Sequence, residues 1–343
     1  MSCTGAIGVM GPYGGLTAND ATQMNWARVS LDKFNQEHKS NFTIEPANVD
    51  DNVAAGVRNV RRFVANPNVI GVVGPTTSVV TRAVGPILDA ADLVYVSPSA
   101  TNETLTDGRL KNFYRDVASD AKQAPAMGGF IAKHLKPQIV LIVTDDEVYS
   151  QDLSKGLKAK LDEFGVRSRS VEITLDQTDF ADVVDQVDAS TNVVALPLVD
   201  VAQATAISSE LAKAGKYPEL IGGDALFLAS LHAPGAFVTT YASDLSVEPS
   251  AQESVRLYQT IFGSLEYFGA PSYVAMQIVL EAALEVCSAD GEVSRAAMVE
   301  QLPKTHLDTS ILGMPISFTS NHELKDAPIH VYQSASGGFT LVQ

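Results

Sequence analysis

Cysteine is nearly absent from this sequence, since only Cys3 and Cys287 occur among its 343 residues. Two thiols are too few for a scaffold held by several disulfides or for a zinc site built from several cysteines. The two residues could bond to each other if the fold brings them together, which the sequence leaves open. Cys3 also stands where a bacterial lipoprotein carries its acyl anchor, and an unmodified free thiol is the equal alternative. No apolar signal segment precedes it, as expected of a mature chain.

Basic residues are scarce as well, with 24 lysines and arginines against 40 acidic residues and a formal net charge of −16. A nucleic-acid partner would need clustered positive charge, so the composition argues against one. The longest apolar runs, such as residues 139–143, fall far short of the ~20 residues that span a bilayer. By contrast, 45% of the residues are hydrophobic, which is enough for sizeable cores. At about 150 residues per domain, the length predicts two domains.

Short apolar runs alternate with helical stripes along the chain. Residues 69–73 and 139–143 are continuous apolar runs, which is typical of strands buried on both faces. Leu153, Leu157 and Leu161 recur at helical spacing in the segment that follows the second run. Further strands are predicted at residues 6–10, 42–49, 93–96, 170–173, 193–196 and 220–222, with a closing hairpin at 329–333 and 339–342. This alternation predicts an α/β protein with two Rossmann-like parallel-sheet lobes.

The common catalytic motifs are missing. The six histidines are scattered without the i, i+4 pair of a zinc helix, and neither a phosphate-binding P-loop nor a G-x-S-x-G nucleophile elbow occurs. Asp145, Asp146 and Glu147 form the densest group of carboxylates and could bind a metal ion or act as acid and base. A solvated loop at a strand end is the favoured interpretation of this group. We therefore expect a protein that is not an enzyme and that needs no cofactor and no metal ion.

Small hydroxyl residues gather after two neighbouring strands of the first half, where parallel sheets bind their ligands. The two segments are Gly74-Pro75-Thr76-Thr77-Ser78 and Ser97-Pro98-Ser99-Ala100-Thr101. Ser78 would open a helix, whose free N–H groups and dipole favour an anion, and Thr101 could add a hydroxyl and an N–H. Together these groups predict a cradle for a carboxylate. Taken singly, each hydroxyl is better explained as a helix N-cap.

The second half offers a complementary acid. Asp224 follows the predicted strand at 220–222, and Asp120 lies at the join between the halves. An acid that faces a hydroxyl cradle suits a zwitterion, whose carboxylate binds one lobe and whose ammonium binds the other. Tyr149 and Tyr273 could form apolar walls of such a site. A cap or turn role for Asp224 and ordinary packing for the tyrosines are the open alternatives.

Several short motifs occur in the order in which a known family carries them. They are Ile7-Gly8-Val9-Met10-Gly11-Pro12, Val72-Val73-Gly74-Pro75, Val96-Ser97-Pro98-Ser99-Ala100-Thr101, Asn112-Phe113-Tyr114-Arg115, the strand at 141–145 with Tyr149, and Ile221-Gly222-Gly223-Asp224. Over essentially its whole length, the chain resembles the periplasmic leucine/isoleucine/valine-binding protein family, the type I substrate-binding components of ABC transporters. The resemblance implies a Venus flytrap with a three-segment hinge. Lobe 1 would contain residues 1–120 and 248–325, and lobe 2 would contain residues 121–247 and 326–343.

The resemblance also implies a ligand-binding set. Its members are Asn19, Thr77, Ser78, Ser99, Ala100, Thr101, Asp120, Tyr149, Asp224 and Tyr273. In such proteins the equivalents of Ser78 and Thr101 hold the ligand α-carboxylate. The Ser99 carbonyl, the Thr101 hydroxyl and Asp224 would hold the ammonium. Asp120 and Tyr149 would face the amino-acid backbone.

Departures from the family pattern concern the ligand side chain, which Tyr273 would border. Asn19 stands where branched-chain binders carry an aromatic residue, and Thr76-Thr77 replaces a more apolar pair, so both predict a more polar pocket. Leu198-Val199 stands where many relatives carry a tyrosine, and this change predicts a less polar pocket. The ligand identity therefore stays open.

The resulting hypothesis is a substrate-binding protein of an ABC importer. It would bind a branched-chain or other neutral L-amino acid and deliver it to the permease, as a monomer in the periplasm or as a cell-surface lipoprotein. One alternative is the ligand-sensing extracellular domain of a receptor. Another is a binder of an amide, urea or an aromatic carboxylate.

Overall fold

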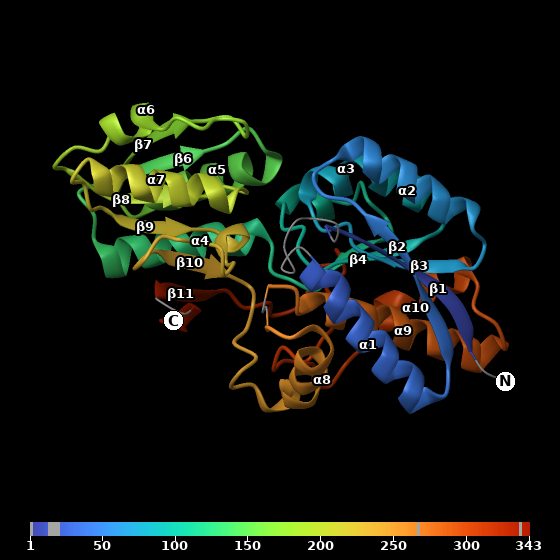
Figure 1. The fold of residues 1–343 in the computed structure, drawn as a ribbon. Helices are drawn as coiled ribbons and strands as arrows, with labels where there is room; N and C mark the ends of the chain where they lie inside the picture. Colours follow the sequence, from blue (N-terminus) through green and yellow to red (C-terminus); the bar gives the residue numbers. More distant parts are fainter. Residues whose placement is uncertain (1–2, 13–20, 266–267, 336–337) are drawn as a thin grey trace. The chain divides into compact units, whose positions relative to one another are not determined.

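The computed structural model describes residues 3–12, 21–265, 268–335 and 338–343, and the chain divides into two compact units (Figure 1). Unit 1 comprises Met1–Val117 and Ala242–Ala327, and unit 2 comprises Ala118–Tyr241 and Pro328–Gln343. The chain passes from one unit to the other at 117/118, 241/242 and 327/328. Each unit is an α/β structure built on parallel strands, which confirms the predicted fold class.

Within its described residues, unit 1 holds a five-stranded parallel sheet in the order β2-β1-β3-β4-β5. The strands are β1 (Thr4–Gly11), β2 (Asn41–Asn48), β3 (Val69–Val73), β4 (Val94–Ser97) and β5 (Phe113–Arg115). The helices are α1 (Thr22–His38), α2 (Val53–Ala65), α3 (Ser78–Asp89), α8 (Gln252–Phe262), α9 (Pro271–Asp290) and α10 (Arg295–Gln301), with short 3₁₀ turns at Glu103–Thr106, Pro249–Ala251 and Leu302–Lys304. Helices α2 and α3 cover one face of the sheet, and α1 and α9 cover the other (Figure 1).

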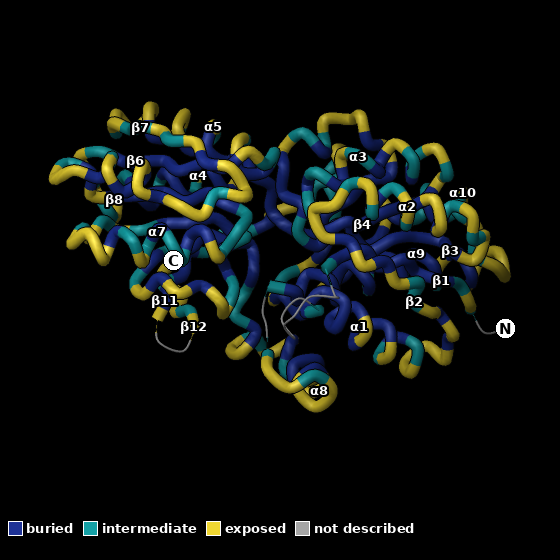
Figure 2. Tube along the Cα trace, turned by 45° about the horizontal axis from the view of Figure 1, so that its top comes forward, coloured by how far each residue is buried: buried dark blue, intermediate teal, exposed yellow. Residues whose placement is uncertain are grey.

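The apolar patterns of the sequence correspond to the core of unit 1. Every residue of β3 is buried, which explains its unbroken apolar run. Val80, Val84 and Leu88 line one face of α3 and join Phe63 of α2 in a single hydrophobic cluster. The same alternation of buried strands and half-buried helices is visible through both units (Figure 2).

Helix α9 is long and apolar enough to cross a membrane by length and composition, with a mean hydropathy of 1.3. Instead, 67% of that stretch is buried inside the protein, and we interpret α9 as the core helix of unit 1. Gly71 of β3 lets α9 approach the sheet, because a Cβ at this position would lie 2.9 Å from Val279 Cγ1.

Unit 2 has, among its described residues, a seven-stranded sheet in the order β12-β11-β10-β9-β8-β6-β7. The strands are β6 (Ile139–Thr144), β7 (Arg167–Glu172), β8 (Thr191–Leu196), β9 (Glu219–Gly222), β10 (Phe237–Thr240), β11 (His330–Ala335) and β12 (Gly338–Leu341). Its helical elements are α4 (Asp120–Phe130), a short π-helix at Ile131–Leu135, α5 (Val148–Glu163), α6 (Ala181–Asp185), α7 (Val201–Lys213) and a 3₁₀ turn at Asp224–Leu226. The predicted closing hairpin is confirmed as the antiparallel pair β11 and β12.

The strand order of each sheet indicates where a ligand would bind. In unit 1, β2 and β3 lie on opposite sides of β1, so the order reverses between β1 and β3. In unit 2, the corresponding reversal lies between β6 and β8. Ligands of parallel α/β sheets bind beyond the carboxyl ends of the strands near such a reversal. Most candidate residues follow the carboxyl ends of β3, β4, β6 and β9, while Asp120 opens α4 and Tyr273 lies in α9.

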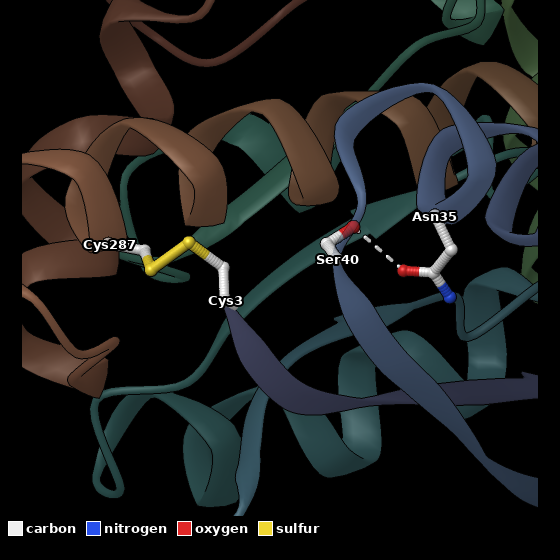
Figure 3. Close-up of a disulfide and its surroundings, with 4 residues drawn as sticks. All are labelled: Cys3, Asn35, Ser40 and Cys287. Carbon is white, nitrogen blue, oxygen red and sulfur yellow. Dashed lines mark hydrogen bonds between the residues drawn. A yellow bond between two sulfur atoms is a disulfide. The ribbon is translucent and has the colours of Figure 1, made fainter. Parts of the chain in front are cut away.

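A disulfide joins Cys3 and Cys287 within unit 1, with an S–S distance of 1.99 Å and Cα atoms 5.9 Å apart (Figure 3). It ties the residue before β1 to the last turns of α9. Of the alternatives that the sequence left open for Cys3, the structure shows the bond to Cys287, so the sulfur is not a free thiol and cannot also carry a thioether-linked lipid. Disulfides persist in oxidising compartments outside the cytosol.

We expect a Cys3→Ser, Cys287→Ser double variant to lose about 2–5 kcal/mol of the free energy of unfolding of unit 1. The bond joins residues 284 positions apart, so it restricts a large loop of the unfolded chain. Trp26 is the single tryptophan and is fully buried in unit 1, so its fluorescence during urea unfolding reports this unit. Wild-type protein unfolded with a reductant is the matched control. An unchanged urea midpoint in the variant would contradict the expectation.

Candidate ligand-binding site

Two loops at the carboxyl ends of β3 and β4 form the candidate site of unit 1. Gly74 allows the first loop to turn, because its φ is +102° and a Cβ would lie 2.4 Å from the Met10 carbonyl oxygen. Ser97 joins the two loops, since its Oγ donates to the Pro75 carbonyl at 2.6 Å and accepts from the Ala100 N–H at 2.9 Å. The two hydroxyl-rich segments predicted from the sequence therefore form one connected surface.

The hydroxyls at the start of α3 do not serve as helix caps. Thr77 is the N-cap residue, yet its side chain makes no capping hydrogen bond. Its Oγ1 is buried and has no hydrogen-bond partner among the described residues. Ser78 Oγ accepts from the Asn102 N–H at 3.2 Å. The alternative interpretation of both residues as ordinary N-caps is wrong, and the Thr77 hydroxyl is available to another group.

The loop after β4 holds the other hydroxyls. Ser99 Oγ donates to the Thr76 carbonyl at 2.7 Å and accepts from Gln23 Nε2 at 2.9 Å. Thr101 is 1% exposed, and its Oγ1 has no hydrogen-bond partner in the described part of the chain. A buried hydroxyl normally has a partner. Thr77 and Thr101 thus offer two unengaged O–H groups at the carboxyl edge of the unit 1 sheet.

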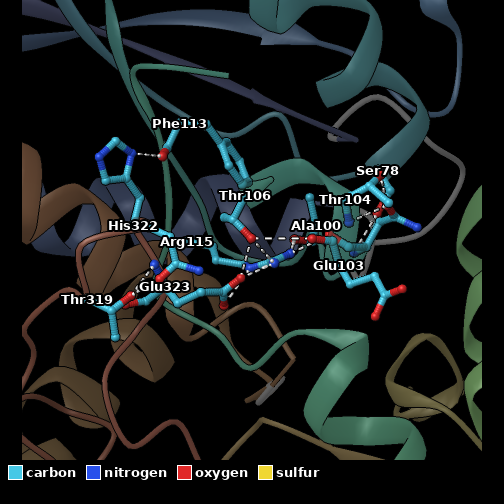
Figure 4. Close-up of polar contacts among 12 residues, drawn as sticks. Ser78, Ala100, Glu103, Thr104, Thr106, Phe113, Arg115, Thr319, His322 and Glu323 are labelled. Atoms are coloured by element: carbon cyan, nitrogen blue, oxygen red, sulfur yellow. Dashed lines mark hydrogen bonds and ion pairs between the residues drawn. The ribbon is translucent and has the colours of Figure 1, made fainter. Parts of the chain in front are cut away.

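Arg115 holds the Thr101 loop in place (Figure 4). This side chain at the end of β5 is fully buried and forms an ion pair with Glu323. Its Nη1 donates to the carbonyls of Ala100 and Asn102, at 3.1 and 2.8 Å, which flank Thr101 on both sides. The Ala100 carbonyl is therefore committed to Arg115. The sequence showed Arg115 only as part of a family motif. Its buried ion pair could not be predicted, because Glu323 lies 208 residues further along the chain.

Tyr273 lies in α9 and is 5% exposed. Its ring meets Trp26 of α1 edge to face, with the ring centroids 6.2 Å apart. Burial raises the pKa of its hydroxyl above the ordinary value. The structure thus places Tyr273 between α1 and α9 of unit 1. Asn19, the remaining predicted residue of this half, lies outside the described residues.

Asp224 is the centre of the candidate site in unit 2. It opens the turn that follows β9 and is 3% exposed. Tyr149 Oη donates to Asp224 Oδ1 at 2.9 Å. Burial raises the pKa of Asp224 to about 6, against the lowering effect of hydrogen bonds from Tyr149 and Gln123. Gly223 makes this contact possible, because a Cβ there would lie 2.1 Å from Tyr149 Oη.

Asp120 and Gln123 lie near this pair on the first turn of α4. Asp120 is 3% exposed, and its charge helps to raise the pKa of Tyr149, after burial and Asp224. Gln123 Nε2 donates to the Thr239 carbonyl at 2.8 Å, while its Oε1 is buried without a hydrogen-bond partner among the described residues. Unit 2 therefore presents acceptors, which is the chemistry that a bound cation requires. Sequence reasoning missed Gln123, although it lies one helical turn after Asp120.

The carboxylate group at the end of β6 has a structural role. Asp145 is 1% exposed, so the interpretation of a solvated loop is wrong for this residue. Its Oδ1 accepts from the Glu147 N–H at 2.9 Å and its Oδ2 from the Val199 N–H at 3.1 Å. Both oxygens brace the loops at the reversal of the unit 2 sheet. Among the described residues, no group of three or more potential metal ligands occurs.

The predicted residues thus form two sets, each within one unit. Unit 1 brings together Thr77, Ser78, Ser99, Ala100 and Thr101, and it also contains Tyr273. Unit 2 brings together Asp120, Tyr149 and Asp224. The first set offers hydroxyl donors, and the second offers carboxylate acceptors, to which the amide oxygen of Gln123 is added.

Two α/β units with polar side chains at the carboxyl ends of their strands are the fold of type I periplasmic binding proteins, which solved structures of this class share. The family model described as periplasmic binding protein matches residues 5–338, and the chain belongs to this family. Members of the family are substrate-binding proteins rather than enzymes, and they work outside the cytoplasm with ABC transporter permeases.

Individual relatives illustrate the range of ligands on this fold. Leu/Ile/Val-binding protein homolog 1 of Brucella melitensis is 28% identical over 255 residues, which are 72% of this chain and 68% of that protein. The leucine-binding protein LivK of Thermotoga maritima superposes with a TM-score of 0.87 at 21% identity, covering 98% of this chain and 97% of LivK. A solute-binding protein of an R. palustris ABC transporter, solved in complex with benzoate, has a TM-score of 0.83 at 14% identity, covering 98% of this chain and 95% of that one. The fold alone therefore does not select the ligand.

Proposed function

We propose that this protein captures a small neutral L-amino acid outside the cytoplasm and delivers it, as a monomer, to the permease of an ABC importer. The observation that carries the proposal is the buried pair of Asp224 and Tyr149, whose acceptor character suits an ammonium group. The disulfide of unit 1 supports an extracytoplasmic location.

The two sets of residues are proposed to hold opposite ends of one zwitterion. The hydroxyls of Thr77, Ser78 and Thr101 would donate to the α-carboxylate, together with N–H groups at the start of α3. Asp224 would accept from the α-ammonium, with Asp120 contributing further negative charge. The Ser99 carbonyl is proposed as an additional acceptor. Each charged end of the ligand would then exchange water for groups of the opposite character.

An aromatic carboxylate is the competing ligand, since a protein of similar fold was solved with benzoate. Such a ligand could use the hydroxyls of unit 1. It would bring no cation to Asp224, and a buried carboxylate without a positive partner is costly. The acceptors of unit 2 therefore favour an amino acid over an aromatic acid.

A thermal-shift screen of the full chain against L-amino acids, small amides and aromatic carboxylates tests this function. We expect stabilisation by neutral amino acids, followed by saturable binding in calorimetry and no product after incubation, as for a binding protein. Stabilisation by an aromatic carboxylate or an amide, with no response to any amino acid, would refute the proposal. Turnover of a bound amino acid would indicate an enzyme instead.

The affinity for an amino acid is expected to depend on pH. Because burial raises the pKa of Asp224 to about 6, a ligand ammonium must displace a proton from Asp224 in acidic solution. Affinity should therefore fall about tenfold per pH unit below pH 6, level off above it, and be accompanied by proton release. Calorimetry between about pH 5 and pH 8 measures both effects. An Asp224→Asn variant should have a flat profile, and affinity that rises on acidification would contradict the assignment.

A further inference from the structure

Gln23, in the first turn of α1, is a buried polar residue that the predicted binding set does not include. It is 6% exposed, and its Nε2 donates to Ser99 Oγ at 2.9 Å. Its Oε1 is buried and has no hydrogen-bond partner in the part of the chain that the structure describes. Buried amide oxygens normally accept a hydrogen bond, so this one points to a missing donor.

The orientation of the Gln23 amide follows from its neighbours. Ser99 has one hydroxyl proton, and it donates that proton to the Thr76 carbonyl at 2.7 Å, which can only accept. Ser99 Oγ can therefore only accept from Gln23, so the nitrogen of the amide must face Ser99. The carbonyl oxygen is consequently fixed on the opposite side and cannot exchange places with the nitrogen.

The oxygen of the Gln23 amide lies where the sheet of unit 1 would receive a ligand. A Cβ at Gly11, the last residue of β1, would lie 3.2 Å from Gln23 Oε1 and 2.9 Å from Thr76 Cγ2. Gln23 Oε1 thus lies at the carboxyl end of β1, beside the loop that follows β3. The strand order reverses between these two strands, which is the natural position of a ligand. A side chain at Gly11 would press against this oxygen, and glycine leaves that space unfilled.

We propose that Gln23 is a specificity-determining residue and that the amino acid presents a hydrogen-bond donor on its side chain, a hydroxyl or an amide, to Gln23 Oε1. This inference rests on the proposed amino-acid binding function. An aliphatic side chain would cover the oxygen without satisfying it, and leaving a buried acceptor unpaired lowers affinity. A polar side chain of the same shape should be preferred by about five- to 150-fold.

Matched amino-acid pairs test the inference on the full chain at neutral pH. Threonine against valine, and asparagine against leucine, compare side chains of similar shape with and without a donor. Calorimetry of wild-type protein should show tighter binding of threonine and asparagine. In the Gln23→Met variant both ratios should fall to about one or reverse. Gln252→Met is the matched control, because the Gln252 amide in α8 donates to the Leu245 and Glu248 carbonyls and should leave both ratios unchanged.

The possible outcomes separate this inference from the function on which it rests. Equal or tighter binding of valine and leucine by wild-type protein would overturn the specificity role while leaving amino-acid binding intact. If the threonine-to-valine and asparagine-to-leucine affinity ratios are unchanged in the Gln23→Met variant, the specificity role of Gln23 is overturned as well. Equal weakening of all four ligands in that variant would assign Gln23 Oε1 to the shared ammonium, not to the side chain. No binding of any of the four would overturn the inference, and failure of every amino acid in the thermal-shift screen would overturn the proposed function itself.

Discussion

Replacing Asp224 by alanine is expected to weaken amino-acid binding by about 3–5 kcal/mol, which is about two to three and a half decades of affinity. The ammonium of the ligand would be buried without its counter-charge, and Tyr149 Oη would lose its acceptor. Calorimetry at neutral pH, where the carboxyl with a pKa of about 6 is ionised, measures the loss. Unchanged affinity would remove Asp224 from the site.

This variant should remain folded, because the buried carboxylate is not a net source of stability at neutral pH. Burial raises the pKa of Asp224 from its ordinary value of about 4 to about 6, so the folded state binds its proton more tightly than the unfolded state does. The stability of unit 2 therefore falls as the pH rises from about 4 to about 6, and removing the acid removes this penalty. Loss of binding in a variant whose thermal stability is not reduced would then report the site alone.

Ser78→Ala is the matched comparison on the carboxylate side. We expect a smaller loss of affinity than for Asp224→Ala, because the N–H groups at the start of α3 remain in place. Ser78 Oγ accepts from the Asn102 N–H, so part of any loss would come from a less ordered loop. An equal or larger loss for Ser78→Ala would contradict the assignment of the dominant interaction to Asp224.

The fold could be predicted where local patterns carry the information. The unbroken apolar run of β3 and the stripe of α3 follow directly from burial on two faces and on one face. Strand β10, at Phe237–Thr240, was missed, because four residues between turns carry too little periodicity to distinguish a strand from a loop. It pairs with β11, which arrives some ninety positions later, with Thr240 opposite His330. Long-range pairing of this kind leaves no local signal.

The positions of the candidate site residues could be predicted to the same extent and for the same reason. Hydroxyls after β3 and β4 and an acid after β9 can be found from their positions at strand ends. The orientation of the Gln23 amide, whose oxygen has no partner among the described residues, depends on Ser99, 76 residues away, and on the proton that Ser99 gives to Thr76. The link between Cys3 and Cys287 likewise spans most of the chain. Such features depend on residues that are distant in the sequence and meet only in the folded chain, so composition and spacing do not predict them.

Arg115→Met is expected to destabilise unit 1 by about 3 kcal/mol, the lower end of the range for breaking a buried ion pair. Arg115 is fully buried, but the Glu323 side chain is 16% exposed, so water can partly solvate the carboxylate that is left behind. The carbonyls of Ala100 and Asn102 would also lose their donor. Urea unfolding followed by Trp26 fluorescence measures the change, and a midpoint equal to that of the wild-type protein would contradict it.

The Arg115→Met, Glu323→Gln double variant separates stability from the positioning of the Thr101 loop. Removing both charges should recover much of the lost stability, since no unpaired buried charge remains. It cannot restore the donors to the Ala100 and Asn102 carbonyls, so Thr101 would still be poorly held and amino-acid affinity should stay low. Recovery of stability and affinity together would show that Arg115 acts only through the ion pair. Recovery of stability alone would identify Arg115 as the residue that holds the carboxylate-binding loop in its working position.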